Sequence, residues 1–175
     1  PYRADPEADW FLLVCVLSVF GIAVFLEVHE VYSDFLTALR YSAFNVVSIA
    51  TTTGYANTDF GLWPMFAPLW MLFLSSFATS AGSTGGGIKM IRALVLYKQV
   101  YRELIRAMHP NAIHPVRIGQ ETTSHNILFA VLAFGFMYMV CIVSLTLILS
   151  FSGLDIITAF TAIVASINNT GPGLG

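Results

Sequence analysis

Two long apolar runs dominate the pattern of hydrophobic and polar positions along this chain. The first extends from Trp10 to Leu26 and the second from Ile127 to Ser150, and neither contains a charged residue. A helix of roughly 20 apolar residues spans the hydrocarbon core of a bilayer, which is about 30 Å thick. Trp10 also suits the interface at one end of the first run. The pattern therefore predicts two membrane-spanning helices.

Two shorter apolar segments, residues 35–49 and 156–167, each end on a loop that contains Thr and Gly. The first would form a helix of about 22 Å, which is too short to cross a bilayer alone. Its Arg40 and Asn45 would be costly against lipid. The pattern favours helices that enter the membrane and stop at the loops, where the negative end of each helix dipole attracts a cation. The alternative is a short surface helix followed by a loop.

A third apolar stretch, residues 66–78, follows Trp63-Pro64 and would cover only about 20 Å as a helix. A Gly-rich sequence interrupts it before a helical pattern resumes at Ile88. Transporters build discontinuous helices at functional depth with breaks of this kind. The alternative is a cytoplasmic turn between two shorter helices. A phosphate-binding loop is disfavoured, because Ile88 occupies the position where that motif requires lysine.

The composition indicates a membrane protein. Hydrophobic residues make up 57% of the 175 residues, charged residues make up 10%, and the mean hydropathy is +0.75. Soluble domains carry about a quarter charged residues. Six of the eight Lys and Arg residues fall between Lys89 and Arg117, which marks a cytoplasmic connection by the positive-inside rule. The acidic residues fall on the opposite side, which we infer to be the outer one: Glu27, Glu30, Asp34, Asp59 and Asp155. They would attract cations, or they would simply cap and solubilise the turns.

Patterns typical of catalysis are missing from the sequence. Cys15 and Cys141 lie inside apolar runs without disulfide or metal spacing, and His109 and His114 suit a solvated loop better than a metal site. We expect a protein that is not an enzyme, uses no organic cofactor and binds no nucleic acid. The abrupt start and the final glycine are typical of a fragment, and the polar first residues do not resemble a secretory signal.

The chain contains an internal repeat of a spanning helix, an acidic turn, a short helix and a Thr-Gly loop. Asp34-x-x-Thr37-Ala38 matches Asp155-x-x-Thr158-Ala159 at an offset of 121 residues, and Thr53-Gly54 matches Thr170-Gly171 at an offset of 117. The difference of four residues predicts that the second short helix is about one turn shorter. Parallel repeats suit a symmetry axis along the membrane normal, with a pore on that axis.

Three motifs occur in order along the chain: Phe44 to Phe60, Ser80 to Lys89, and Asn168 to Gly175. They resemble, respectively, the third pore loop, the intramembrane gating loop and the fourth pore loop of the Trk/Ktr/HKT superfamily of potassium transporters. Arg102-Glu103-Leu104 and His109-Pro110-Asn111-Ala112 make the resemblance closest to the C-terminal part of the bacterial Trk branch.

This resemblance implies an all-α polytopic membrane protein built from M1–pore helix–M2 repeats, of which the chain holds about two of four. A third repeat would occupy residues 1–97, a cytoplasmic basic linker residues 98–125, and the start of a fourth repeat, without its last M2, residues 126–175. Each repeat would supply one segment of a selectivity filter for K⁺, the transported ion. The filter residues would be Thr51, Thr52, Thr53, Gly54, Asn168, Asn169, Thr170 and Gly171.

The resemblance also implies a gate and partners. The loop that would obstruct the pore beneath the filter comprises Ala81, Gly82, Ser83, Thr84, Gly85, Gly86 and Gly87. Bacterial members work as homodimers in the lipid of the inner membrane and bind a cytosolic regulatory ring protein that senses nucleotides. Part of that contact would fall on the basic stretch, through Lys98, Arg102 and Arg106.

The expected function is therefore potassium uptake through a four-part filter above a Gly-rich gate. Neither loop has the Thr-Val-Gly-Tyr-Gly sequence of potassium channels, and one glycine per loop favours looser discrimination of K⁺ from Na⁺ or Rb⁺. The alternatives are a Na⁺-selective or Na⁺-coupled relative, a nucleotide-binding membrane subunit that uses the Gly-rich loop, and a purely structural membrane subunit.

Overall fold

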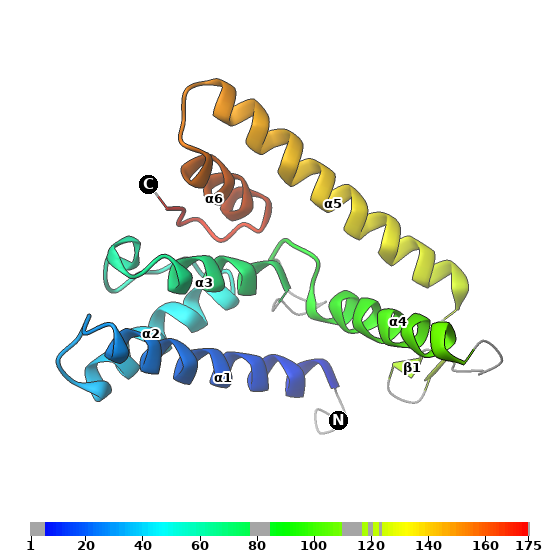
Figure 1. Ribbon diagram of the computed structural model, residues 1–175, viewed down its shortest axis with the longest axis horizontal. Helices are drawn as coiled ribbons and strands as arrows, with labels where there is room; N and C mark the ends of the chain where they lie inside the picture. Colours follow the sequence, from blue (N-terminus) through cyan, green and yellow to red (C-terminus); the bar gives the residue numbers. More distant parts are fainter. Residues whose placement is uncertain (1–5, 78–84, 110–116, 119–120, 123, 175) are drawn as a thin grey trace.

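The computed structural model describes residues 6–77, 85–109, 117–118, 121–122 and 124–174. These residues contain six α-helices. In chain order they are α1 (Pro6–Val28), α2 (Phe35–Ala50), α3 (Phe66–Phe77), α4 (Met90–Met108), α5 (His125–Phe151) and α6 (Ile156–Ile167) (Figure 1). A short 3-10 helix, η2 (Phe60–Leu62), precedes α3. Two antiparallel strands of two residues each, β1 (Arg117–Ile118) and β2 (Glu121–Thr122), precede α5.

The two long helices, α1 and α5, confirm the two predicted spans. They contain 23 and 27 residues, which makes them about 35 and 40 Å long. Among the described residues, two helices are long and apolar enough to cross a membrane, and they are these two. Large apolar side chains cover their outer surfaces, such as Leu17 on α1 (63% exposed) and Phe136 on α5 (70% exposed). Such surfaces are suited to lipid.

The two short helices, α2 and α6, have the relative lengths that the repeat predicted. They contain 16 and 12 residues, and the difference of four residues is about one turn. Each begins at an aspartate, as expected. The Asp34 carboxylate accepts a hydrogen bond from the Thr37 N–H at 3.3 Å, and the Asp155 carboxylate accepts one from the Ile157 N–H at 3.1 Å. These caps satisfy N–H groups that have no partner within the helix.

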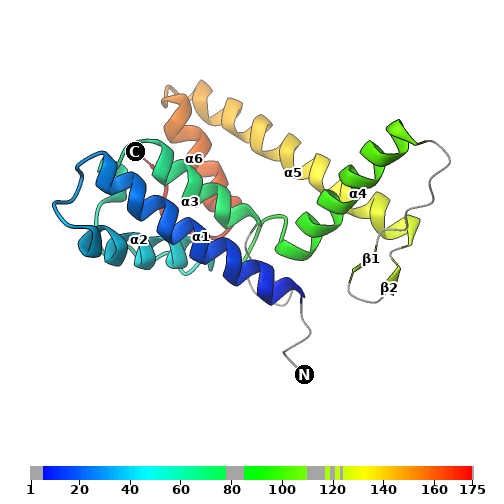
Figure 2. The same cartoon turned by 60° about the horizontal axis from the view of Figure 1, so that its bottom comes forward.

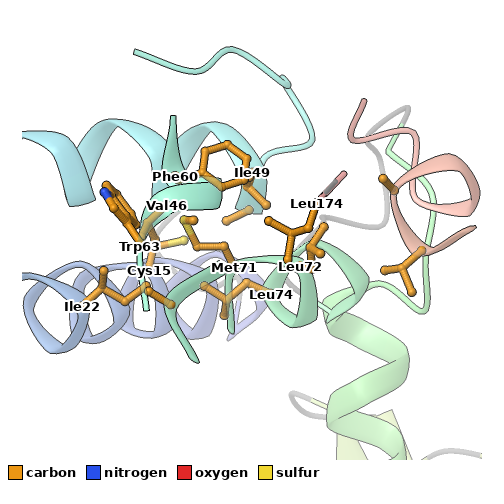
Figure 3. Close-up of a cluster of buried hydrophobic side chains, with 14 of the residues drawn as sticks. Cys15, Ile22, Val46, Ile49, Phe60, Trp63, Met71, Leu72, Leu74 and Leu174 are labelled. Carbon is orange, nitrogen blue, oxygen red and sulfur yellow. The ribbon is translucent and has the colours of Figure 1, made fainter. Parts of the chain in front are cut away.

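A buried core joins the helices of the first repeat. Helix α2 packs against both α1 and α3, and Figure 3 shows side chains from all three meeting. Ile22 of α1, Ile49 of α2 and Met71 of α3 are all almost fully buried. Leu174, which follows α6 in the chain, belongs to the same cluster. The end of the second repeat is therefore packed into the core of the first.

Helix α3 lies between the two repeats. It contacts α2 of the first repeat and α6 of the second, and α6 in turn packs against α5 (Figures 1 and 2). The helix begins at Phe66, the first residue of the predicted apolar stretch, and the Pro64 carbonyl oxygen before it accepts the Ala67 N–H at 2.9 Å. Its expected last residue, Ala78, lies outside the described residues.

Helix α4 begins at Met90, two residues later than the predicted Ile88. The Ile88 N–H donates to the carbonyl oxygen of Ser76 at 2.8 Å, so Ile88 still belongs to the segment that closes the break after α3. The helix ends before His109, as predicted. It extends away from α1–α3 and packs against α5 (Figure 2), where the Arg92 guanidinium lies 4.2 Å from the centre of the Phe134 ring.

Candidate ion-binding loops

The loops after α2 and α6 share three backbone hydrogen bonds, and the first loop has a fourth, from the Gly54 N–H to the Ser48 carbonyl oxygen at 3.4 Å. In the first loop, the N–H groups of residues 51, 52 and 53 donate to the carbonyl oxygens of residues 47, 49 and 48, at 2.8–3.0 Å. In the second loop, every donor and every acceptor lies 117 residues later, at 2.9–3.2 Å: Asn168 to Val164, Asn169 to Ser166 and Thr170 to Ala165. Residues that the sequence offset of 117 pairs with each other therefore have the same backbone structure.

Each loop also has left-handed backbone at the same two positions. The φ angles are 55° at Thr52 and 80° at Gly54, against 56° at Asn169 and 92° at Gly171. Glycine and asparagine adopt this region readily, but a β-branched residue such as Thr52 does not. Backbone of this kind costs about 1–3 kcal/mol and persists where the surrounding structure over-determines it, often at functional sites.

The two loops contact each other through their backbones. A Cβ atom added at Gly54 would lie 2.4 Å from the carbonyl oxygen of Thr170 and 3.5 Å from the Pro172 ring. No side chain fits in that space. The structure thus brings together two loops that the sequence predicted as equivalent, at the C-terminal ends of α2 and α6. Those ends carry the negative half of each helix dipole.

A cavity of about 430 Å³ lies between the segments that leave the two loops. Residues 56 and 58–61 line it from the first repeat and residues 172–174 from the second. Asp59 is the one ionisable residue in that lining, and its carboxylate also accepts the Gly61 N–H at 3.0 Å. The cavity beside the loops therefore carries one acidic group, and Asp59 is one of the acidic residues that the sequence placed on the outer side.

The first residues of the two loops have different surroundings. Thr51 is exposed, and its hydroxyl is bonded locally, to the Val47 carbonyl oxygen at 2.7 Å and to the Thr53 hydroxyl at 2.7 Å. Asn168, at the equivalent position, is 0% exposed. The first loop is thus held by its own helix, whereas the second is also held by side-chain bonds to other helices.

Those bonds form a buried polar cluster around the Asn168 side chain. Its Oδ1 accepts from the Tyr138 hydroxyl of α5 at 2.8 Å, and its Nδ2 donates to the hydroxyls of Ser75 and Ser76 of α3 at 3.0 and 2.9 Å. The Asn168 side chain is therefore a tether between helices. Tyr138, Ser75 and Ser76 were not among the predicted site residues. The signal that points to them is polarity within predicted apolar spans, which is costly without a partner.

The described end of the Gly-rich break lies against the second loop. The Gly86 N–H donates to the carbonyl oxygen of Asn168 at 3.1 Å. A Cβ atom at Gly86 would lie 2.2 Å from the Ile167 carbonyl oxygen, so the contact requires glycine. Of the predicted gating loop, Gly85, Gly86 and Gly87 are described, whereas Ala81, Gly82, Ser83 and Thr84 lie outside the described residues.

The predicted partner-contact residues Lys98, Arg102 and Arg106 are spaced by four on α4 and so share one face of the helix. The Glu103 carboxylate lies 3.2 Å from Arg102 and 3.7 Å from Arg106. The C-terminal part of α4 lies apart from the loops that follow α2 and α6 (Figure 1). Within the described ranges, the structure contains no cluster of His, Cys, Asp and Glu that could hold a metal ion.

Comparison with known proteins identifies the family of the chain. The model of the family TrkH, cation transport protein, matches residues 9–175. The Trk system potassium uptake protein TrkH of Salmonella typhimurium and that of Escherichia coli are each 42% identical to the chain, over 99% of its length. The TrkG protein of Escherichia coli is 34% identical, over 100% of the chain and 36% of its own length.

A solved structure agrees with these matches. The crystal structure of the potassium transporter TrkH from Vibrio parahaemolyticus matches 99% of the chain with a TM-score of 0.93 and 39% identity, over 37% of its own length. The chain likewise spans 36% of the length of the Salmonella and Escherichia proteins. Because the family match extends over nearly all of its residues, the chain belongs to the TrkH family of cation transport proteins.

Proposed function

We propose that this chain forms part of a potassium uptake protein of the bacterial inner membrane. The observation that carries the proposal is the pair of equivalent loops, Thr51–Gly54 and Asn168–Gly171. They share three backbone hydrogen bonds and their left-handed positions, and they meet at Gly54 and Thr170. The names of the relatives, which are potassium uptake proteins, support K⁺ as the ion.

The loops would act by replacing part of the hydration shell of K⁺. Potassium pores do this with rings of backbone carbonyl oxygens. Helices α2 and α6, which we call the pore helices, end at the loops and direct the negative ends of their dipoles there. A ring of four segments needs two further repeats from the rest of the transporter. The process requires no covalent chemistry and no organic cofactor.

We infer that the Gly-rich break, residues 81–87, is the gate of this pore. The support is the hydrogen bond from the Gly86 N–H to the Asn168 carbonyl oxygen, which joins Gly86 to the loop that we propose as a filter segment. A segment in that place obstructs ions that leave the filter. Moving it would open the path without changing the fold of the pore helices.

The partners follow from the same proposal. Membrane lipid would cover the exposed apolar faces of α1 and α5, and a second copy of the transporter would complete a homodimer. The basic face of α4, with Lys98, Arg102 and Arg106, would contact a cytosolic regulatory ring protein that senses nucleotides. The division into a third repeat (1–97), a linker (98–125) and a fourth repeat (126–175) stays a prediction.

A Na⁺-conducting relative is the second candidate, because each loop has a single glycine in the left-handed position and lacks the channel sequence. The test is ion uptake by cells that lack other K⁺ uptake systems and express the full transporter containing this chain. We expect K⁺ uptake that excess Na⁺ inhibits weakly and Rb⁺ inhibits strongly. Gly54→Asp should abolish uptake while the protein stays in the membrane. Absence of K⁺ uptake by the unmodified transporter would overturn the proposal, and uptake of Na⁺ alone would establish the second candidate.

A further inference from the structure

Each loop is followed by a short outgoing segment, residues 55–57 after Gly54 and residues 172–174 after Gly171. Within the part of the chain that the structure describes, the backbone of these residues forms no hydrogen bond with another backbone group. Tyr55 is 72% exposed and so adds little packing. The outer end of each loop must therefore be held by contacts with side chains.

In the first repeat, the contact comes from Asn45 of α2. Its side chain is 0% exposed, and its Nδ2 donates to the Asn57 side-chain oxygen at 2.7 Å and to the Tyr41 carbonyl oxygen at 2.9 Å. The bond to Asn57 connects the pore helix with the outgoing segment. The donor side of this short bond is buried, whereas the acceptor belongs to the exposed residue Asn57.

In the second repeat, the contact comes from Thr161 of α6, which is also 0% exposed. Its hydroxyl accepts a hydrogen bond from the Leu174 N–H at 3.1 Å and donates to the Leu174 carbonyl oxygen at 3.1 Å. One side chain thus binds both backbone groups of a residue in the outgoing segment.

The two contacts hold the same point of the repeat. Asn57 and Leu174 each lie three residues after the loop glycine and are separated by the offset of 117 that relates the loops. The holding residues differ in type, an amide in one repeat and a hydroxyl in the other. Asn45 binds the side chain of Asn57, whereas Thr161 binds the backbone of Leu174. Both contacts nevertheless connect the pore helix with the residue at the same position of the outgoing segment.

We propose that Asn45 and Thr161 are positioning residues that secure the outer end of each filter segment to its own pore helix and thereby set ion selectivity. This inference rests on the proposed function. Each loop is secured at its inner end by at least three backbone hydrogen bonds to the pore helix. Its outer end is bonded to that helix by one side chain, Asn45 or Thr161. Without the outer contact, the carbonyl oxygens can move inward around the smaller Na⁺, so that discrimination by cavity size is lost.

The test compares variants of the full transporter containing this chain in competitive Na⁺ and K⁺ uptake. Asn57→Ala removes the acceptor from an exposed residue, and Thr161→Val removes the hydroxyl while keeping the shape of the side chain. Asn57→Ala should raise the ratio of Na⁺ to K⁺ uptake about fivefold, the factor that corresponds to one lost hydrogen bond, and Thr161→Val, which loses two bonds to Leu174, at least about fivefold. Thr161→Ser should restore the original ratio. Ser166→Ala is the matched control, because that hydroxyl bonds only within α6, to the Ala162 carbonyl oxygen at 2.8 Å.

The outcomes separate this inference from the proposed function. If the unmodified transporter takes up K⁺ and both variants keep its ion ratio, the positioning role is wrong and the function stands. If the unmodified transporter takes up no K⁺, the function and the inference fail together. If Thr161→Val does not reach the membrane, Asn57→Ala decides alone, because Asn57 is exposed and its truncation leaves the buried pore helix intact.

Discussion

Substitution of Gly54 by alanine tests whether the two loops must meet as closely as they do. The change adds one Cβ atom at a residue with φ of 80°, where it would lie 2.4 Å from the Thr170 carbonyl oxygen. Ordinary contact begins at 3.4 Å, so the loops must separate by about 3.4 − 2.4 = 1.0 Å. The clashing atom belongs to the backbone, so rotation of a side chain cannot relieve it. We expect the separation to displace the carbonyl oxygens of both loops.

The cost of this substitution has two parts, and a control separates them. The left-handed backbone costs an alanine about 1–2 kcal/mol wherever it occurs. Gly153, in the turn between α5 and α6, has a φ of 94° and no atom within 4 Å of an added Cβ. Gly153→Ala therefore carries the backbone cost without the clash. If Gly54→Ala has a larger effect on uptake than Gly153→Ala, the difference measures the cost of the clash between the loops.

The assay is K⁺ uptake at matched membrane levels of the two variants of the full transporter. We expect Gly54→Ala to lower the uptake rate about tenfold or more, which corresponds to at least about 1.4 kcal/mol in the barrier. We expect Gly153→Ala to retain a rate close to that of the unmodified transporter. Equal rates for the two variants would refute the argument, because the clash would then have no consequence for the ion path.

Three further predictions concern the buried Asn168 cluster, the Gly-rich break and the basic face of α4. Asn168→Ala removes the buried hydrogen bonds to Ser75, Ser76 and Tyr138 and should lower the free energy of unfolding by about 1–3 kcal/mol. The measurement is the Tm of the purified transporter, and an unchanged Tm would contradict the role of Asn168 as a tether. Deletion of residues 85–87 should raise K⁺ flux by removing the obstruction, and a deletion variant in the membrane without that gain would argue against the gate. Lys98→Glu combined with Arg106→Glu should weaken binding of the cytosolic ring protein in a pull-down, whereas unchanged binding would place that contact elsewhere.

The elements of this fold were predictable because local chemistry determines them. A run without charges marks each spanning helix, and an aspartate marks the start of each short one. The offsets of 121 and 117 residues predict the difference in length between α2 and α6, since both quantities count residues between the same cap and the same loop. Boundaries that depend on tertiary contacts were less accurate. Helix α4 starts late because the Ile88 N–H is bound by Ser76, which lies across the break.

The contacts that position the loops could not be predicted, because they too depend on tertiary structure. Tyr138 lies 30 residues from Asn168 in sequence, and Ser75 lies 93 residues from it. Each is a polar residue within an apolar helix, which marks it as needing a partner but does not identify that partner. Asn45 showed the same ambiguity: its cost against lipid was evident from the sequence, whereas its bond to Asn57 depends on the return of the chain after the loop.

The two loops share one backbone structure but differ in what can move them. The first loop is bonded within itself and to α2, and it contacts the second loop at Gly54 and Thr170. The second is bonded at Asn168 to α3, to α5 and to Gly86 at the end of the break. A displacement of the end of α3 acts on the second loop through the buried hydrogen bonds at Asn168, and on the first loop through the packing of α3 against α2. Because Gly86 of the break is also bonded to the second loop, we expect that loop to be the one whose geometry changes most when the proposed gate moves.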